Sequence, residues 1–193
     1  MAVVGKAGAA PRDRYAELLV VVVVIAALLV GWGVKAGAEA RAVHIEDMGF
    51  RASYGQNWVR EQPQQPEVLK ITDPGSGARF QTTITVSRLD NAGPSQQVAV
   101  SLNQERAGDR QLYQILNGET IQWRGRETYR NDFAYVYVSP DLLNPAVPVV
   151  LHGVDYVFQH GAATYVITFL ADEHVYDQAW GQFERFLRAF SPV

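Results

Sequence analysis

The sequence contains no cysteine, which excludes disulfide bonds, thiol catalysis, thiolate zinc sites and iron–sulfur clusters. It also lacks an excess of positive charge, because residues 35–193 carry 14 Lys and Arg residues against 18 Asp and Glu. Nucleic acid binding requires clustered Lys and Arg to neutralise phosphates, so we expect no nucleic acid partner. Glycine-rich phosphate-binding fingerprints are absent as well.

Long hydrophobic runs are scarce too, and the one exception is informative. Residues 18–34 contain no charged residue and include twelve Leu, Val or Ile residues. At 1.5 Å per residue this run reaches about 26 Å, close to the roughly 30 Å hydrocarbon core of a bilayer. It predicts one transmembrane helix, in contact with the lipid bilayer over residues 18–34. A cleaved secretory signal is the alternative, since Ala36-Gly37-Ala38 offers a small-x-small cleavage pattern.

The flanking charges predict how the chain is arranged around this span. Three basic residues precede it, which favours a cytoplasmic N-terminus by the positive-inside tendency. The sequence then divides into a short cytoplasmic leader (1–17), the transmembrane helix (18–34), a linker (35–46) and one domain (47–193). We therefore expect a single-pass membrane protein with its domain on the periplasmic or extracellular face.

The domain reads mainly as antiparallel strands. Residues 68–72 read as a short strand that ends at a loop at residues 73–77, and residues 80–87 then alternate between apolar and polar side chains. Four further runs have strand character, at residues 120–129, 133–139, 149–159 and 164–170. Asn131-Asp132 and His160-Gly161 lie where tight turns are needed. These connections are too short for parallel crossovers.

Two segments have helical spacing instead. The first begins at Ser95, repeats apolar residues through Leu112, Ile115 and Leu116, and ends at Asn117-Gly118. The second carries one aromatic stripe after a possible cap at Asp172, and its members are Tyr176, Ala179, Trp180, Phe183, Phe186, Leu187 and Phe190. The expected fold class is α+β, with a twisted antiparallel sheet covered by helices.

The order of these elements, with several short phrases, resembles the PsbP-like family. The phrases are GFRASYGQNWVRE, RFQTTITVSRL, WRGRETYRNDFAYVYVS, VDYVFQHGAATYVITF and WGQFERFLRAFSP. The resemblance covers about residues 46–192. It implies an extracytoplasmic, non-catalytic accessory subunit that stabilises or assembles a membrane protein complex, photosynthetic or respiratory.

Candidate catalytic and metal-binding residues are few. His152, Asp155 and His160 come nearest to a metal cluster, but eight residues of regular strand separate the two histidines by about 26 Å. Ser76 lies among glycines without the strand-to-helix context of a nucleophile elbow. We therefore expect no enzymatic activity, no metal site and no cofactor.

One charged pattern suggests a binding surface. Arg124, Arg126 and Arg130 fall on one face of a single expected strand, either as a solvated face or as a docking stripe for an acidic protein surface or lipid head groups. The first functional hypothesis is docking onto a membrane complex. The alternative is an extracytoplasmic small-ligand or lipid-binding protein, favoured by an open sheet face lined by aromatic residues, namely Tyr135, Tyr137, Tyr156 and Phe158.

Overall fold

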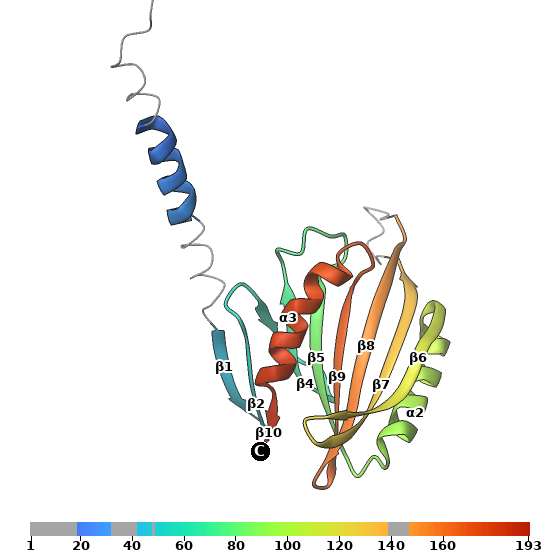
Figure 1. Cartoon of the computed structure of the whole chain (residues 1–193). Helices are drawn as coiled ribbons and strands as arrows, with labels where there is room; N and C mark the ends of the chain where they lie inside the picture. Colours follow the sequence, from blue (N-terminus) through green and yellow to red (C-terminus); the bar gives the residue numbers. More distant parts are fainter. Residues whose placement is uncertain (1–18, 32–41, 48, 139–146) are drawn as a thin grey trace, which may run out of the picture. The chain divides into compact units, whose positions relative to one another are not determined.

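The computed structural model describes residues 19–31, 42–47, 49–138 and 147–193 (Figure 1). The chain divides into two compact units, residues 1–41 and 42–193. Residues 19–31 of the first unit are helical. Over the described ranges, no helix has the length and apolar character needed to cross a bilayer. The predicted span 18–34 extends past both ends of the described helix, and the leader 1–17 lies outside the described residues.

The folded body begins earlier than the sequence indicated. Residues 42–46 were expected to belong to the linker 35–46, but they form most of strand β1 (Ala42–Asp47). This strand pairs along its whole length with β2 (Phe50–Gly55). Antiparallel pairing with β2 supplies the backbone hydrogen bonds that a linker would have left to water, so the body comprises residues 42–193 rather than 47–193.

The centre of the body is a seven-stranded antiparallel sheet with the order β3-β4-β5-β9-β8-β7-β6. A smaller sheet has the order β1-β2-β10. The remaining strands are β3 (Val59–Glu61), β4 (Glu67–Asp73), β5 (Thr82–Asp90), β6 (Gln111–Trp123), β7 (Arg126–Tyr137), β8 (Val149–His160), β9 (Ala163–Asp172) and β10 (Ser191–Pro192).

Helix α3 (Tyr176–Ala189) covers one face of the large sheet, as its aromatic stripe predicted (Figure 1). Phe183 stacks on Phe169 of β9 at 4.7 Å between ring centroids, and its edge meets Tyr156 of β8 at 5.8 Å. At the end of the helix Phe190 stacks on Phe50 of β2 at 5.3 Å. One continuous aromatic core therefore joins α3 to both sheets.

Helix α2 (Ser95–Asp109) lies on the opposite face. It packs on Val157 and Val166, whose strand neighbours Tyr156 and Ile167 point into the α3 core. Successive residues of a strand point to opposite faces, so the sheet lies between the two helices. The expected α+β fold, with an antiparallel sheet covered by helices, is confirmed.

Two local expectations were wrong. Leu112, Ile115 and Leu116 do not continue the helix; they lie in β6 and are 76%, 56% and 53% exposed. Their helical spacing arose because both faces of this strand meet solvent, so nothing enforces alternation. Asn131-Asp132 is not a turn either, since both residues are buried within β7.

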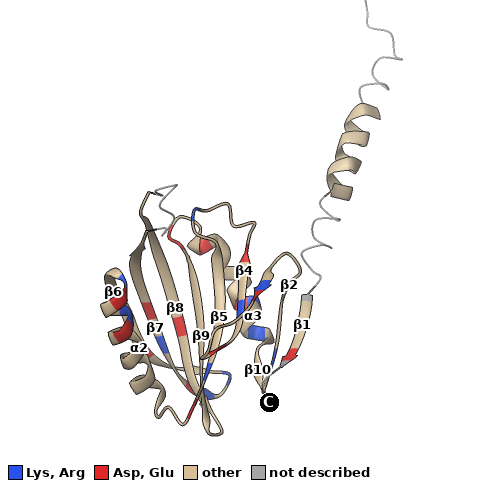
Figure 2. Cartoon of the chain, turned by 180° about the vertical axis from the view of Figure 1, so that it is seen from behind, with Lys and Arg blue, Asp and Glu red and all other residues tan. Residues whose placement is uncertain are grey.

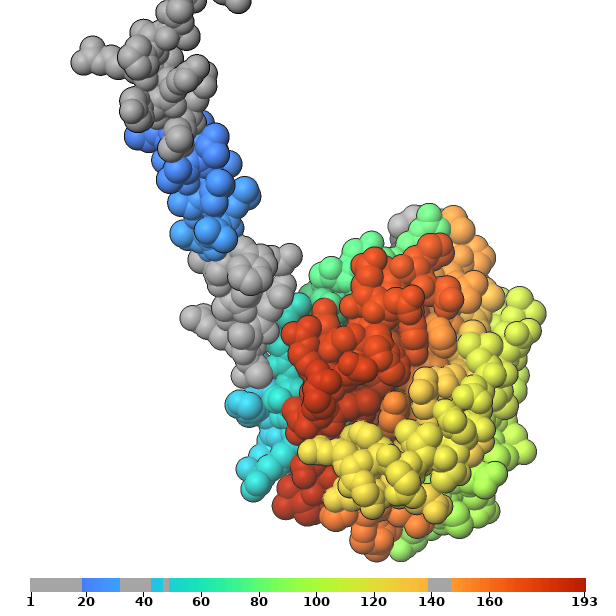
Figure 3. Space-filling view, viewed as in Figure 1, coloured from blue at the N-terminus to red at the C-terminus, as the bar shows by residue number. Residues whose placement is uncertain are grey.

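The turn between β6 and β7 falls instead at Arg124-Gly125. These two residues have φ values of 54° and 75°, the pair of left-handed conformations that a two-residue hairpin requires. Beside the turn, Trp123 packs against Tyr156 and Phe158 on the α3 face. Figure 3 shows this hairpin, in yellow, reaching the red residues of α3.

Candidate functional site

The α2 face of the large sheet carries a row of polar residues where an apolar surface would be expected. The row crosses six adjacent strands, and each member is the direct cross-strand partner of the next. Its members, from β3 to β7, are Glu61, Lys70, Thr85, Thr168, Asp155 and Asn131. We call these six residues the polar row. Figure 2 shows charged residues within the central strands on this side of the molecule.

Two members of the polar row, Asn131 and Asp155, bond directly to side chains of α2, and Asp155 is completely buried. Its carboxylate accepts two hydrogen bonds from Arg106 of α2, at 2.5 and 3.0 Å. It accepts two more from Thr168 Oγ1 at 2.7 Å and from Asn131 Nδ2 at 3.1 Å. Asn103 of α2 completes the group by exchanging amide hydrogen bonds with Asn131.

These contacts hold both charges in place. Burial opposes the charged form of Arg106, but the adjacent Asp155 carboxylate outweighs it and raises the pKa of the guanidinium. The guanidinium also lies over the Phe133 ring, 4.3 Å from its centroid. Phe133 in turn covers Gly153, where any side chain would collide with the ring. Asp155 already accepts four hydrogen bonds, so this group fixes α2 on the sheet.

Beyond the end of α2 the same face opens into a groove of about 660 Å³. Thr85, Thr168 and Leu170 form part of its floor, and all three are half-buried. Charged residues of β3 and β4 lie along one side, whereas Phe80, Tyr135 and Tyr137 lie along the other. Because of the strand order, the side chains that line the groove are charged on one side, bear hydroxyl groups along the floor and are aromatic on the other side.

Three basic residues, Lys70, Arg79 and Arg110, and two acidic ones, Glu61 and Glu67, line the groove. Lys70 Nζ lies 2.6 Å from a carboxylate oxygen of Glu61, whose other oxygen accepts a hydrogen bond from Thr72 at 2.5 Å. The hydrogen bonds from Lys70 and Thr72 lower the pKa of Glu61. Arg79 and Arg110 also line the groove and are exposed. Among the described residues, neither arginine makes an ion pair.

The four aromatic residues named in the sequence analysis are divided between the two faces. Tyr135 and Tyr137 line the open groove. Tyr156 and Phe158 lie on the other face, closed in by α3 and Trp123. The single open face lined by all four residues is therefore not formed: the α2 side is open but holds two of them, and the α3 side is a closed core.

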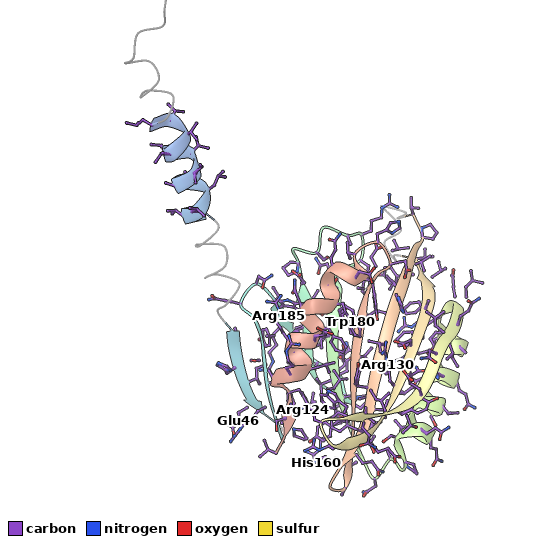
Figure 4. All side chains as sticks on the ribbon, in the orientation of Figure 1. Glu46, Arg124, Arg130, His160, Trp180 and Arg185 are labelled. Atoms are coloured by element: carbon purple, nitrogen blue, oxygen red, sulfur yellow. The ribbon has the colours of Figure 1, made fainter. Side chains whose placement is uncertain are left out.

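The three candidate docking arginines do not share one strand. Arg124 lies in the β6–β7 turn and its guanidinium donates a hydrogen bond to the Phe190 carbonyl oxygen. Arg126 and Arg130 lie on one face of β7, and Arg130 pairs with Asp132 at 3.0 Å and lies 5.7 Å from the Trp180 ring. Figure 4 shows Arg130 near Trp180 and Arg124 near the end of α3. The single-face stripe is thus corrected to one hairpin whose tip and second strand carry the arginines.

The histidines considered as metal ligands lie apart. His152 stacks on Tyr176 with 3.9 Å between ring centroids, and Asp155 is paired with Arg106 on the opposite face of the same strand. His160 ends β8, near the β8–β9 turn (Figure 4). Within the part of the chain that the structure describes, no three His, Asp or Glu side chains gather as a metal site would require.

Strand β6 is a second candidate surface that the sequence did not indicate. It ends the large sheet, and no other strand among the described residues pairs with its outer side. Residues 114–120 are exposed on both faces of the strand. Its thirteen residues include one charged residue, Glu119, and neither Pro nor Lys. Natural edge strands are usually protected by such residues or by β-bulges, and the pairing of β6 with β7 is irregular at residues 111–114 and 115–117.

Comparison with known proteins bears on the fold. No family model matches the chain, and no curated protein matches it significantly. Among solved structures, cyanobacterial PsbP from Synechocystis superposes with a TM-score of 0.59 at 12% identity, over 80% of this chain and 94% of that one. This chain has the PsbP-like fold. The Saccharomyces cerevisiae Ran-binding protein Mog1p matches this PsbP-like chain with a TM-score of 0.51 at 13% identity, over 79% and 96% of the two chains.

Proposed function

We propose that this PsbP-like protein is a non-catalytic accessory subunit of a membrane protein complex. Residues 18–34 anchor it in the bilayer with the N-terminus in the cytoplasm, and the body docks on the complex at the periplasmic or extracellular face. A tether raises the effective concentration of the body at its partner to about the millimolar range. A small docking surface is then sufficient for stable association.

The main support for docking on a partner is the free edge of β6. An unpaired edge presents a row of backbone N–H and C=O groups to which an extended segment of a partner can add as a further strand. Ile115 and Leu116 of this strand are both exposed, so they can hold the added strand by apolar contact. Arg124 and Arg126 at the adjoining hairpin supply positive charge for acidic groups of the same partner.

The test is a pair of charged substitutions on the edge. Ile115→Lys with Leu116→Lys should leave the fold intact, because both side chains are already exposed, and should block strand addition. The tagged full-length chain would be purified in mild detergent, and its co-purifying membrane subunits quantified by mass spectrometry. We expect the double variant to lose at least about tenfold of the partner, equivalent to about 1.4 kcal/mol of binding free energy.

The matched control is Val59→Lys on β3, which forms the opposite edge of the same sheet and is 53% exposed. This variant should retain the partner at the wild-type level. Equal partner recovery from wild type and the β6 variant would reject docking through β6. A full-length chain that washes off membranes in carbonate would reject the anchor.

A second candidate function is the binding of a small ligand or lipid outside the cytoplasm. The groove on the α2 face favours it, because a volume of about 660 Å³ lies within the range of small-molecule sites. The two functions use different surfaces, so each can be tested without the other.

A further inference from the structure

We propose that the groove on the α2 face binds a single-chain amphiphile with an anionic head. This inference rests on the second candidate function and specifies its ligand. It follows from three features of the groove, namely an aromatic side, unpaired positive charge at the rim, and a size that suits one acyl chain. The shared chemistry is a hydrocarbon tail with a carboxylate or phosphate head.

The aromatic side would receive the tail. Phe80 meets Tyr137 edge to face at 5.3 Å between ring centroids, and Tyr135 lies beside them on the same strand face as Tyr137. Val149 and Leu170 continue this apolar surface along the floor. Contact with these side chains would remove the apolar tail from water, which is the main source of affinity for such ligands.

The hydroxyl-bearing floor and the balanced ion pair restrict where a head group can bind. Lys70 is neutralised by Glu61, and Thr168 donates its hydroxyl hydrogen to Asp155. Thr168 therefore offers only acceptor lone pairs to the groove, which disfavours a carboxylate or phosphate lying directly on it. The head is thus directed to cations elsewhere at the rim.

Arg79 and Arg110 provide those cations. Both line the groove and are exposed, and within the described ranges no carboxylate pairs with either. Arg110 lies over the Tyr135 ring, 5.6 Å from its centroid, so positive charge adjoins the aromatic side. A guanidinium can bind a carboxylate or phosphate through two parallel hydrogen bonds. A ligand with an apolar tail and an anionic head would satisfy both features at once.

Site-resolved photolabelling tests this assignment on the full-length chain in discs of zwitterionic lipid. The probes are a palmitate analogue with a diazirine on its tail, the lysophosphatidic acid made from it, and its neutral monoacylglycerol. Labelled peptides are mapped by mass spectrometry. We expect both anionic probes to label peptides containing Phe80, Tyr135 and Tyr137 at least about tenfold more than the neutral probe does. The ratio of the two anionic probes identifies the preferred head.

Two variants locate the interaction. Arg79→Glu with Arg110→Glu should reduce anionic labelling of the groove about tenfold. Arg185→Glu with Arg188→Glu is the control, since it makes the same change of charge on exposed residues of α3 and should leave labelling unchanged; Figure 4 labels Arg185. Thr85→Leu, which fills the floor without altering charge, should reduce labelling by all three probes.

Three results would overturn the inference. They are equal groove labelling by neutral and anionic probes, labelling spread evenly over the body, and undiminished labelling of the Arg79/Arg110 variant. Labelling within residues 18–34 reports on the membrane anchor separately. Failure of the groove can therefore be distinguished from failure of the anchor, and neither result depends on docking through β6.

Discussion

The two faces of the large sheet differ in how they are packed and in how far they are covered. On the α3 face, aromatic rings fill a dry core in which Phe169, Phe183 and Phe190 are completely buried. On the α2 face, a helix with few buried apolar side chains is held by Arg106 and Asp155, and the sheet beyond it is left open. Stability is thus concentrated on one side, which leaves the other free to carry polar groups and a groove.

The comparison predicts that the largest loss of stability follows from damage to the α3 face. Phe183→Ala removes a ring that contacts β8, β9 and α3 itself, and should lower the free energy of unfolding by about 4 kcal/mol. Urea denaturation followed by circular dichroism measures this. Leu116→Ala, at an exposed position on β6, is the control and should change stability by less than about 0.5 kcal/mol.

Breaking the ion pair of the α2 face should cost somewhat less. Asp155→Ala leaves Arg106 without its partner, and we expect a loss of about 3 kcal/mol. The combined variant Arg106→Met with Asp155→Leu should be more stable than Asp155→Ala, because it removes both charges together. The combined variant could instead be the less stable of the two. That result would mean that the attraction between Arg106 and Asp155 exceeds the free-energy cost of removing both charges from water.

The smallest effect concerns pH and the rim of the groove. The hydrogen bonds from Lys70 and Thr72 lower the pKa of Glu61 in the folded protein. Their stabilisation is therefore complete above the ordinary Glu pKa of about 4.3 and is lost as the pH falls through the lower folded value. The loss should stay under about 1 kcal/mol because the pair is partly exposed. Denaturation midpoints measured as a function of pH test this. Glu61→Gln should remove the part of the decrease at acid pH that Glu61 causes, and a pH profile of midpoints identical to that of the wild type would contradict the prediction.

Much of the fold could be predicted because one helix and several strands have a clear pattern. The stripe from Tyr176 to Phe190 predicted α3 and its buried face, since a helix that packs on one side must repeat apolar residues at helical spacing. The cap was misplaced, because the helix begins at Tyr176 and Asp172 instead accepts a hydrogen bond from the His174 backbone. The short hairpin between β8 and β9 was equally clear in the sequence.

The errors occur where tertiary contacts override local pattern. Asn131 and Asp132 are typical turn residues, but Asn131 is held inside β7 by Asn103 and Asp155, which are distant in the sequence. The helical spacing in β6 was misleading because an exposed edge strand has no buried face to impose alternation.

The groove could not be predicted from the sequence, because its lining comes from β3, β4, β5, β7, β8 and β9. One signal was available. The alternation over residues 80–87 puts Thr83 and Thr85 on the face opposite Ile84 and Val86, and the structure places them on the groove side. Which residues meet them there depends on strand order and on where α2 ends.

The pairing of β1 determines how a pull on the N-terminal segment reaches the body. Force applied before Ala42 acts first on the pair Ala42 and Gly55 and then on each following pair in turn. The backbone hydrogen bonds between β1 and β2 therefore break one pair after another. The six residues released would lengthen the chain by about 20 Å. Phe50, stacked on Phe190, marks the point where this extension stops. The first strand can therefore separate from β2 before the stacked pair of Phe50 and Phe190 comes under load.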